Sequence, residues 1–195
     1  MAPGNVEARA RKKRRQGQLR MAILFAVGAT AAIAVATIAP NAVLTLKRVK
    51  LDARLRYHTK TVLGRLTQDG EVEFVERDGK KYARLTEKGE RKLELYKEKL
   101  RLAGKPRKRW DGNYRLVIFD IPEKRKRVRE RIRHEMREVG FLRVQDSAWV
   151  YPYDCEAFIA LLKAELHIGK DVLYAVIASI EHDVWIRKHF CLPLD

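Results

Sequence analysis

Cysteine is scarce in this sequence of 195 residues, and several familiar catalytic signatures are missing. The two cysteines, Cys155 and Cys191, lie far apart and match no zinc-binding spacing. They fit a reducing compartment and two ordinary thiols better than a disulfide framework. The sequence also has no glycine-rich phosphate loop, no nucleophile elbow and no kinase motif, which argues against those enzyme classes.

Acidic residues are also few. There are 25 Asp and Glu against 42 Lys and Arg, and the formal net charge is +17. This excess of positive charge says nothing about the fold, but it predicts a polyanionic binding partner. Nucleic acid is the first candidate and an anionic membrane surface the second. Hydrophobic residues make up 46% of the chain, enough for a core, which argues against wholesale disorder.

The beginning of the chain changes abruptly from basic to apolar. Residues 1–20 are polar and basic, and we expect a disordered arm there. Residues 21–39 carry no charge, and as a helix they would span about 28 Å, close to a hydrocarbon core of ~30 Å. Two interpretations stay open: a buried first helix of a cytoplasmic protein, or a single N-terminal anchor in contact with the membrane. A cleavable signal peptide is disfavoured because the remainder has the character of an intracellular, nucleic-acid-binding protein.

The next part of the chain shows a helical pattern followed by a hairpin pattern. A short helix over 41–50 precedes a longer one over 53–68, whose apolar side chains recur every three or four residues. Two short strand patterns follow, joined by Asp78-Gly79, which is a strong hairpin signal. Thr86 then caps a further helix from residue 87 to about 102.

This order over residues 40–103 resembles a winged helix-turn-helix domain. The run Leu85-Thr86-Glu87-Lys88-Gly89 is frequent in bacterial winged-helix regulators at the end of the wing. The resemblance implies that 53–68 is a recognition helix for DNA; the alternative is an ordinary amphipathic helix with a solvated basic face. The predicted DNA-binding residues lie on its free face and in the hairpin: Arg54, Tyr57, Lys60, Thr61, Arg65, Gln68, Lys80 and Lys81.

An exposed linker and a second domain complete the chain. Gly, Pro and four basic residues mark 104–112 as the linker, and Trp110 is placed to dock it onto the next domain. Residues 113–180 then read strand, helix, two strands, helix and strand, the ferredoxin-like βαββαβ order. Residues 181–195 form a short helix or a C-terminal arm. The predicted fold class is therefore α+β: a winged helix-turn-helix and a ferredoxin-like domain, preceded by a long apolar helix.

The second domain carries two family resemblances. Its run Leu116-Val117-Ile118-Phe119-Asp120-Ile121-Pro122, with Arg125 and Arg127 after it, resembles the CRISPR-associated spacer-acquisition endonucleases, the "Cas-two" family. The longer pattern, with Trp110-Asp111-Gly112 before it and Trp149-Val150-Tyr151-Pro152-Tyr153-Asp154 after it, is closer to the PaaX-like proteins, or phenylacetate-repressor-like proteins. Both resemblances imply a ferredoxin-like fold, and the first implies a homodimer whose interface holds the Asp that ends the first strand.

Asp120 has two interpretations. In the first, Asp120 and its copy in a dimer hold one Mg²⁺, which activates water for phosphodiester cleavage, while Arg125, Arg127 and Arg129 neutralise the phosphates. In the second, which we favour, Asp120 caps the helix that starts at Pro122. Phe119 stands where the endonucleases usually have Tyr, and this departure weakens the case for catalysis.

The sequence therefore predicts a dimeric PaaX-like transcriptional regulator that binds DNA. The alternative from the enzyme class is a metal-dependent endonuclease acting on DNA or RNA, with Asp120 as its catalytic and metal-binding residue. A third hypothesis, a membrane-tethered scaffold, depends on residues 21–39 alone.

Overall fold

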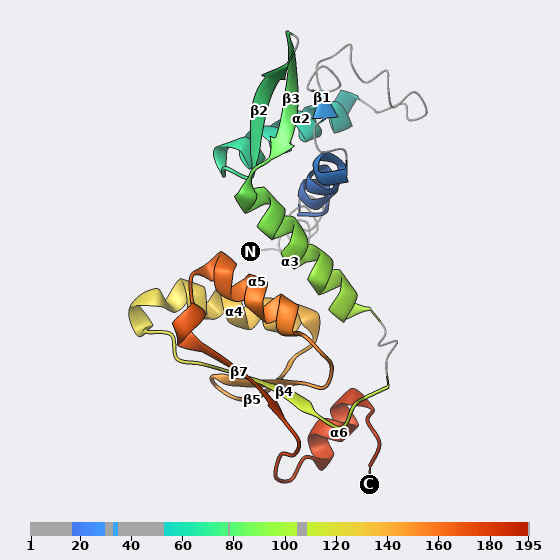
Figure 1. Cartoon of the computed structure of the whole chain (residues 1–195), viewed down its shortest axis with the longest axis vertical. Helices are drawn as coiled ribbons and strands as arrows, with labels where there is room; N and C mark the ends of the chain where they lie inside the picture. The colour runs from blue at the N-terminus through green and yellow to red at the C-terminus, as the bar shows by residue number, and fades with distance from the viewer. Residues whose placement is uncertain (1–16, 30–32, 35–52, 78, 105–108, 195) are drawn as a thin grey trace, which may run out of the picture. The chain divides into compact units, whose positions relative to one another are not determined.

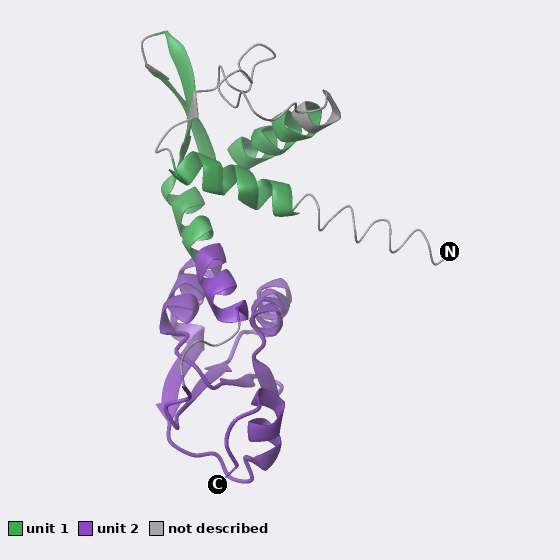
Figure 2. Ribbon diagram, turned by 90° about the vertical axis from the view of Figure 1, so that its right-hand side faces the viewer, with its two compact units in different colours: residues 1–94 green, residues 95–195 purple. Residues whose placement is uncertain are grey.

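The protein combines helices with two antiparallel sheets, in two compact units (Figures 1 and 2). Unit 1 comprises residues 1–94 and unit 2 residues 95–195. The division between the two units falls inside a helix, and the linker predicted over 104–112 stays a prediction. The computed structural model describes the following residues: 17–29, 33–34, 53–77, 79–104 and 109–194.

Unit 1 consists of helices packed on a three-stranded sheet in the order β1-β3-β2. A helix over 17–29 comes first. The elements that follow are β1 (Ile33–Ala34), α2 (Ala53–Gln68), β2 (Val72–Arg77), β3 (Lys80–Leu85) and α3 (Glu87–Ala103). Helix α3 contributes residues 87–94 to unit 1 and 95–103 to unit 2. The bounds predicted for α2 are confirmed, and the predicted short helix over 41–50 lies outside the described residues.

The long apolar helix predicted over 21–39 is wrong. The observed helix begins at residue 17, within the stretch expected to be an arm, and Ile33 and Ala34 already belong to β1, where Ile33 pairs with Ala83. The high alanine content of this segment favours helix, but cross-strand pairing with β3 places Ile33 and Ala34 in a strand. Among the described residues, no helix combines the length and the apolar character needed to cross a membrane.

The core of unit 1 draws apolar side chains from every major element. Leu24 and Val27, from the helix over 17–29, are almost completely buried. This helix is therefore a packing element, as one of the two interpretations of the apolar segment proposed. The other buried members of the core are Val62, Leu63, Leu66, Val72, Ala83, Leu85 and Leu93.

The predicted hairpin and the helix after it are both observed. Strands β2 and β3 pair in register from Val72 opposite Leu85 to the hairpin end. Gly79 in the connecting turn has φ +67°, a left-handed conformation that glycine adopts without strain. Thr86 caps α3 as predicted, because its Oγ1 accepts a hydrogen bond of 3.1 Å from the Gly89 backbone N–H.

Unit 2 is a four-stranded sheet, ordered β5-β6-β4-β7, with α4 and α5 over one face (Figure 1). Its elements are β4 (Tyr114–Phe119), α4 (Lys126–Val139), β5 (Leu142–Gln145), β6 (Ala148–Tyr151), α5 (Glu156–Leu166) and β7 (Val172–Ile177). Val117 and Trp149 of the sheet, Met136 of α4 and Phe158 of α5 are buried in the core between sheet and helices. The predicted bend of residues 141–151 into two strands is confirmed.

The end of the chain packs on the other face of this sheet. Helix α6 (Val184–Phe190) places Ile186 in a small buried cluster with Tyr114 and Val150. Trp110 packs against the same cluster: its Nε1 donates to the Asn113 carbonyl oxygen at 2.9 Å, and the Arg187 guanidinium lies 5.2 Å from its ring centroid. Trp110 therefore docks onto this domain, as the sequence predicted.

Candidate nucleic-acid interface

Helix α2 has one buried face and one exposed polar face. Val62, Leu63 and Leu66 recur at helical spacing and point into the core of unit 1. The other side is open, and the Tyr57 side chain leaves 70% of its surface exposed. Four predicted DNA-binding residues are exposed together on this helix: Tyr57, Lys60, Arg65 and Gln68.

The other two predicted residues of α2 differ from these four. Thr61 is partly exposed. Its Oγ1 donates a hydrogen bond of 2.9 Å to the Tyr57 carbonyl oxygen. Its hydroxyl proton is therefore already engaged and is not free for a base or a phosphate. Arg54 lies in the first turn of α2, and its side chain is outside the described part of the chain.

The hairpin brings two more cations to the surface of unit 1. Lys80 and Lys81 are exposed at the start of β3, next to the turn. Arg84, further along the same strand, forms an ion pair of 2.5 Å with Glu73 across the hairpin. Within the described part of the chain neither Lys80 nor Lys81 forms an ion pair, whereas the charge of Arg84 is balanced by the Glu73 carboxylate.

The charge of α2 itself has one sign. Its sequence, ARLRYHTKTVLGRLTQ, contains no aspartate or glutamate. An exposed helix face that carries cations, amide and hydroxyl groups but no carboxylate attracts phosphate and does not repel it at any position. This is the electrostatic pattern that a helix in contact with nucleic acid requires.

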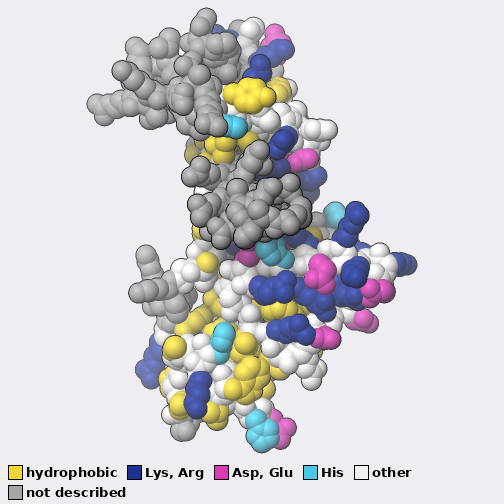
Figure 3. Space-filling model, turned by 180° about the vertical axis from the view of Figure 1, so that it is seen from behind, with side chains coloured by type: hydrophobic (Ala, Val, Ile, Leu, Met, Phe, Trp, Pro, Cys, Tyr) yellow, Lys and Arg dark blue, Asp and Glu magenta, His cyan; other side chains and the backbone are white. Residues whose placement is uncertain are grey.

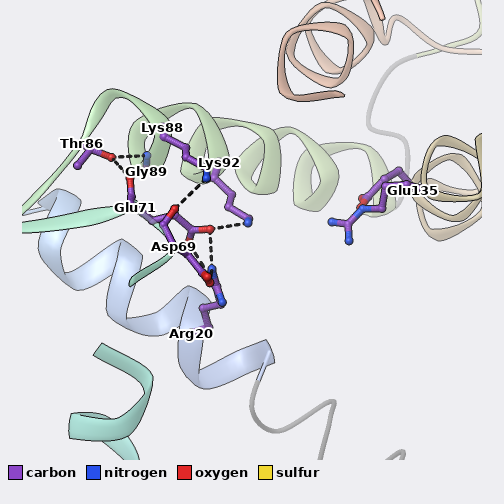
Figure 4. A network of polar contacts seen from close by, with 10 residues as sticks. Arg20, Asp69, Glu71, Thr86, Lys88, Gly89, Lys92 and Glu135 are labelled. Carbon is purple, nitrogen blue, oxygen red and sulfur yellow. Dashed lines mark hydrogen bonds and ion pairs between the residues drawn. The ribbon is translucent and has the colours of Figure 1, made fainter. Parts of the chain in front are cut away.

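A buried carboxylate holds the base of the hairpin (Figure 4). Glu71, in the turn between α2 and β2, is only 1% exposed. Its Oε1 lies 2.5 Å from Arg20 Nη2 of the first helix and 2.6 Å from Lys92 Nζ of α3. Because an uncompensated buried carboxylate is costly, these two cations fix the turn between α2 and the hairpin against two other helices.

Backbone packing around Glu71 explains the run from Leu85 to Gly89. Thr86 donates twice: its N–H to the Glu71 carbonyl oxygen at 3.1 Å and its Oγ1 to the Gly70 carbonyl oxygen at 2.6 Å. At Gly89 a Cβ atom would lie 2.0 Å from the Glu71 carbonyl oxygen, far inside van der Waals contact. The run from Leu85 to Gly89 therefore allows the start of α3 to pack closely against the turn after α2.

Sequence reasoning missed Arg20 and Glu71. The two residues are 51 positions apart, and Arg20 lies in a basic stretch that was taken for an arm. The motif ending at Gly89 was noticed, but its partner in space was not, because no local pattern indicates which backbone a glycine approaches.

In unit 2 the predicted phosphate contacts have different environments. Arg125 donates to Asp171 Oδ2 at 2.9 Å and to the Leu166 and His167 carbonyl oxygens at 3.0 and 3.1 Å, so it stabilises the end of α5. Arg129 forms an ion pair with Glu123. Of the three predicted arginines only Arg127 is exposed and has no ion pair among the described residues.

Lys and Arg gather over α4, but acidic side chains are interspersed with them (Figure 3). Glu135 of α4 is buried and lies 2.5 Å from both Arg131 Nε and Lys99 Nζ. Burial alone would lower the pKa of Lys99, but Glu135 and Glu138 outweigh it and raise the pKa above its ordinary value. Much of the positive charge on α4 is therefore already balanced within unit 2.

Asp120 is exposed where β4 ends, and the interpretation that it caps a helix is wrong. A 3₁₀ turn, η2 (Glu123–Arg125), starts after Pro122, and no side chain caps either this turn or α4. Across the residues that the structure describes, no group of three or more His, Cys, Asp or Glu side chains could hold a metal ion. In the described part of one chain, Asp120 is thus the single carboxylate at the predicted magnesium site. The magnesium hypothesis stays a prediction.

The sheet of unit 2 leaves part of one face open. Leu116, Ile118, Ala148, Leu173 and Ala175 are paired neighbours in β4, β6 and β7, on the face opposite α4 and α5. None of the five is buried, and the Leu173 side chain is 60% exposed. This part of the sheet face is therefore accessible to solvent and carries no charged side chain at these five positions.

Comparison with known proteins identifies the second unit. Residues 107–188 match the family model of the PaaX protein central Cas2-like domain. The resemblance to PaaX-like proteins with a Cas2-like domain is therefore confirmed for this part of the chain. The search of curated proteins found no match.

Proposed function

We propose, from the premise that residues 107–188 carry the central Cas2-like domain of a PaaX-like protein, that the chain is a transcriptional regulator. Unit 1 binds double-stranded DNA as a winged helix-turn-helix domain, and unit 2 pairs with a second copy. The observation that carries the proposal is the exposed, acid-free face of α2 directly before the β2–β3 hairpin.

The topology of unit 1 supports this assignment. A winged helix-turn-helix has a recognition helix followed by a two-stranded wing, with a short strand before the helix that joins the same sheet. Strand β1 pairs with β3, and β3 with β2, so the short first strand lies at the edge beside the wing. In this arrangement Tyr57, Lys60, Arg65 and Gln68 face the DNA groove, while Lys80 and Lys81 reach the flanking phosphates.

Pairing of two copies gives the DNA site its symmetry. The strand order β5-β6-β4-β7, with α4 and α5 on one face, suits the ferredoxin-like fold. Its uncharged open face around Leu173 is self-complementary, because apolar groups meet apolar groups when a copy packs on it about a two-fold axis. A dimer then presents two α2 helices, which predicts a DNA site with two related half-sites.

Removing two cations from α2 tests DNA binding. The double variant Lys60→Ala/Arg65→Ala should bind duplex DNA more weakly, and the slope of log K against log salt should fall by about one per lost phosphate contact. The measurement is fluorescence anisotropy of a labelled duplex over a series of salt concentrations.

The matched control removes the same charge from unit 2. Lys170 and Lys188 are exposed and outside the proposed interface, so Lys170→Ala/Lys188→Ala should keep the wild-type salt slope. If the two double variants weaken binding equally, the effect is one of net charge. If the α2 variant binds as the wild type does, α2 does not contact DNA and the winged-helix proposal fails.

A further inference from the structure

A glycine lies at the centre of the exposed face of α2. Gly64 is exposed, and it lies between Lys60, one helical turn before it, and Gln68, one turn after it. Tyr57 is two turns before it on the same side. The face proposed to contact DNA therefore has a gap in its middle where no side chain projects.

Nothing within the described protein requires this glycine. Its backbone is not among the glycines with positive φ, and it lies four residues before the end of α2, so it is not a helix cap. Apart from its two chain neighbours and the backbone of its own helix, no heavy atom of the described chain lies within 4 Å of the position that a Cβ atom would occupy. Gly89, by contrast, is required by a backbone oxygen of its own chain.

The absence of a side chain has a cost in stability. Glycine is among the least favourable residues in a helix interior, and alanine among the most favourable, because glycine loses more backbone freedom on folding. A position that is open, helical and solvent-exposed would therefore gain from alanine. Since no described residue takes up this space, the physical reason for glycine that we infer is the close approach of another molecule to the helix backbone there.

The surroundings indicate what approaches. The neighbouring Thr61 hydroxyl is bonded back to the Tyr57 carbonyl oxygen, so it does not reach outward beside the gap. The gap is bordered by Lys60 and Arg65, and α2 contains no acidic residue. An occupant between cations with no opposing carboxylate carries negative charge along its edges, as the walls of a DNA groove do.

We propose that Gly64 is the point of closest approach between α2 and double-stranded DNA, where the groove surface packs directly on the helix backbone. The inference rests on the proposed function and names a specific contact within it. Gly64 then sets how deeply α2 enters the groove, and hence whether Tyr57 and Gln68 reach the base edges.

Adding a methyl group at residue 64 tests this contact, with stability and binding expected to change in opposite directions. Gly64→Ala should raise the melting temperature by about 4 °C, because it improves helix propensity in open space. The same variant should bind DNA about tenfold more weakly, and Gly64→Gln, which is larger, about a hundredfold more weakly. The probe is a duplex enriched by the full-length wild-type protein from a library with a randomised 20-base-pair segment.

A matched control adds the same methyl group elsewhere. Gly169 of unit 2 is exposed, has ordinary φ and open space at its Cβ position, so Gly169→Ala should bind the selected duplex as the wild type does. Wild-type binding by both residue 64 variants overturns the inference and leaves the proposed function standing. If the wild type enriches no duplex, the proposed function fails, and this inference with it.

Discussion

Replacing Gly89 with alanine should destabilise unit 1 strongly. The new Cβ would lie 2.0 Å from the Glu71 carbonyl oxygen and 3.0 Å from its carbonyl carbon. The obstacle is backbone, which cannot rotate away as the end of a flexible side chain can. The oxygen is also held in place, since it accepts the Thr86 N–H at 3.1 Å, while the Glu71 N–H donates to the Leu66 carbonyl oxygen at 2.8 Å.

The size of the effect follows from three contributions. Alanine improves helix propensity by about 1 kcal/mol. Overpacking against a fixed backbone costs roughly 1–3 kcal/mol, and separating the Thr86 N–H from its acceptor in this partly buried turn adds about 1–3 kcal/mol. The net loss in the free energy of unfolding is therefore about 1–5 kcal/mol, which corresponds to a melting temperature lower by roughly 4–40 °C for a unit of this size.

The assay can separate the two units. Trp110, Trp149 and Trp185, the three tryptophans of the chain, all lie in unit 2, so tryptophan fluorescence reports that unit, while far-ultraviolet circular dichroism reports helices in both. Gly89→Ala should lower the dichroism transition more than the fluorescence transition. Gly64→Ala is the matched control, and it should shift the dichroism transition upward. A Gly89→Ala protein within about 0.5 kcal/mol of the wild type would refute the reasoning, because backbone contact at that distance must be relieved.

Three further predictions concern unit 2. Hydrogen bonding to the Arg115 guanidinium holds the pKa of Asp111 down to about 2, so the carboxylate stabilises the fold above about pH 4 and this contribution is lost as the pH falls toward 2. The urea midpoints of wild type and Asp111→Asn should thus differ at pH 5 and converge near pH 2; parallel curves would contradict the ion pair. Leu173→Glu should weaken self-association at least a hundredfold, measured by sedimentation velocity, because the dimer would then bury an unpaired charge. Val176→Glu is the control and should not weaken it, because Val176 is 56% exposed on the opposite face of the sheet. Equal effects of the two variants would place the interface elsewhere. If the endonuclease alternative holds, the protein cleaves DNA or RNA with Mg²⁺ and Asp120→Asn abolishes cleavage; no cleavage of any substrate, with or without Mg²⁺, would retire it.

Periodicity and turn chemistry predicted the regular elements well. The bounds of α2 were correct because its apolar residues recur at helical spacing and a turn signal, Asp69-Gly70, follows directly. The hairpin was predicted from Asp78-Gly79, and the capped start of α3 from Thr86, because each depends on residues close in sequence. Local sequence signals of this kind predict the structure correctly when tertiary packing favours the same conformation.

The first helix and the arginines of unit 2 show where such reasoning fails. Residues 21–39 were taken as one helix because alanine is helix-favouring. Ile33 instead belongs to a strand, because it pairs with Ala83, which is 50 positions away in the sequence. Arg125 was taken as a phosphate contact because it lies in a basic run. Its role depends on Asp171 and on the end of α5, which only the tertiary structure brings to it.

The surroundings of Glu71 also bear on how shortened versions of the protein should be made. The basic start of the chain invites trimming, but Arg20 neutralises Glu71, and Leu24 and Val27 complete the core beneath the hairpin. A fragment that starts after the first helix would leave that carboxylate with Lys92 alone and expose apolar surface. Fragments intended for binding assays or crystallisation should therefore keep every residue from Gly17 onward.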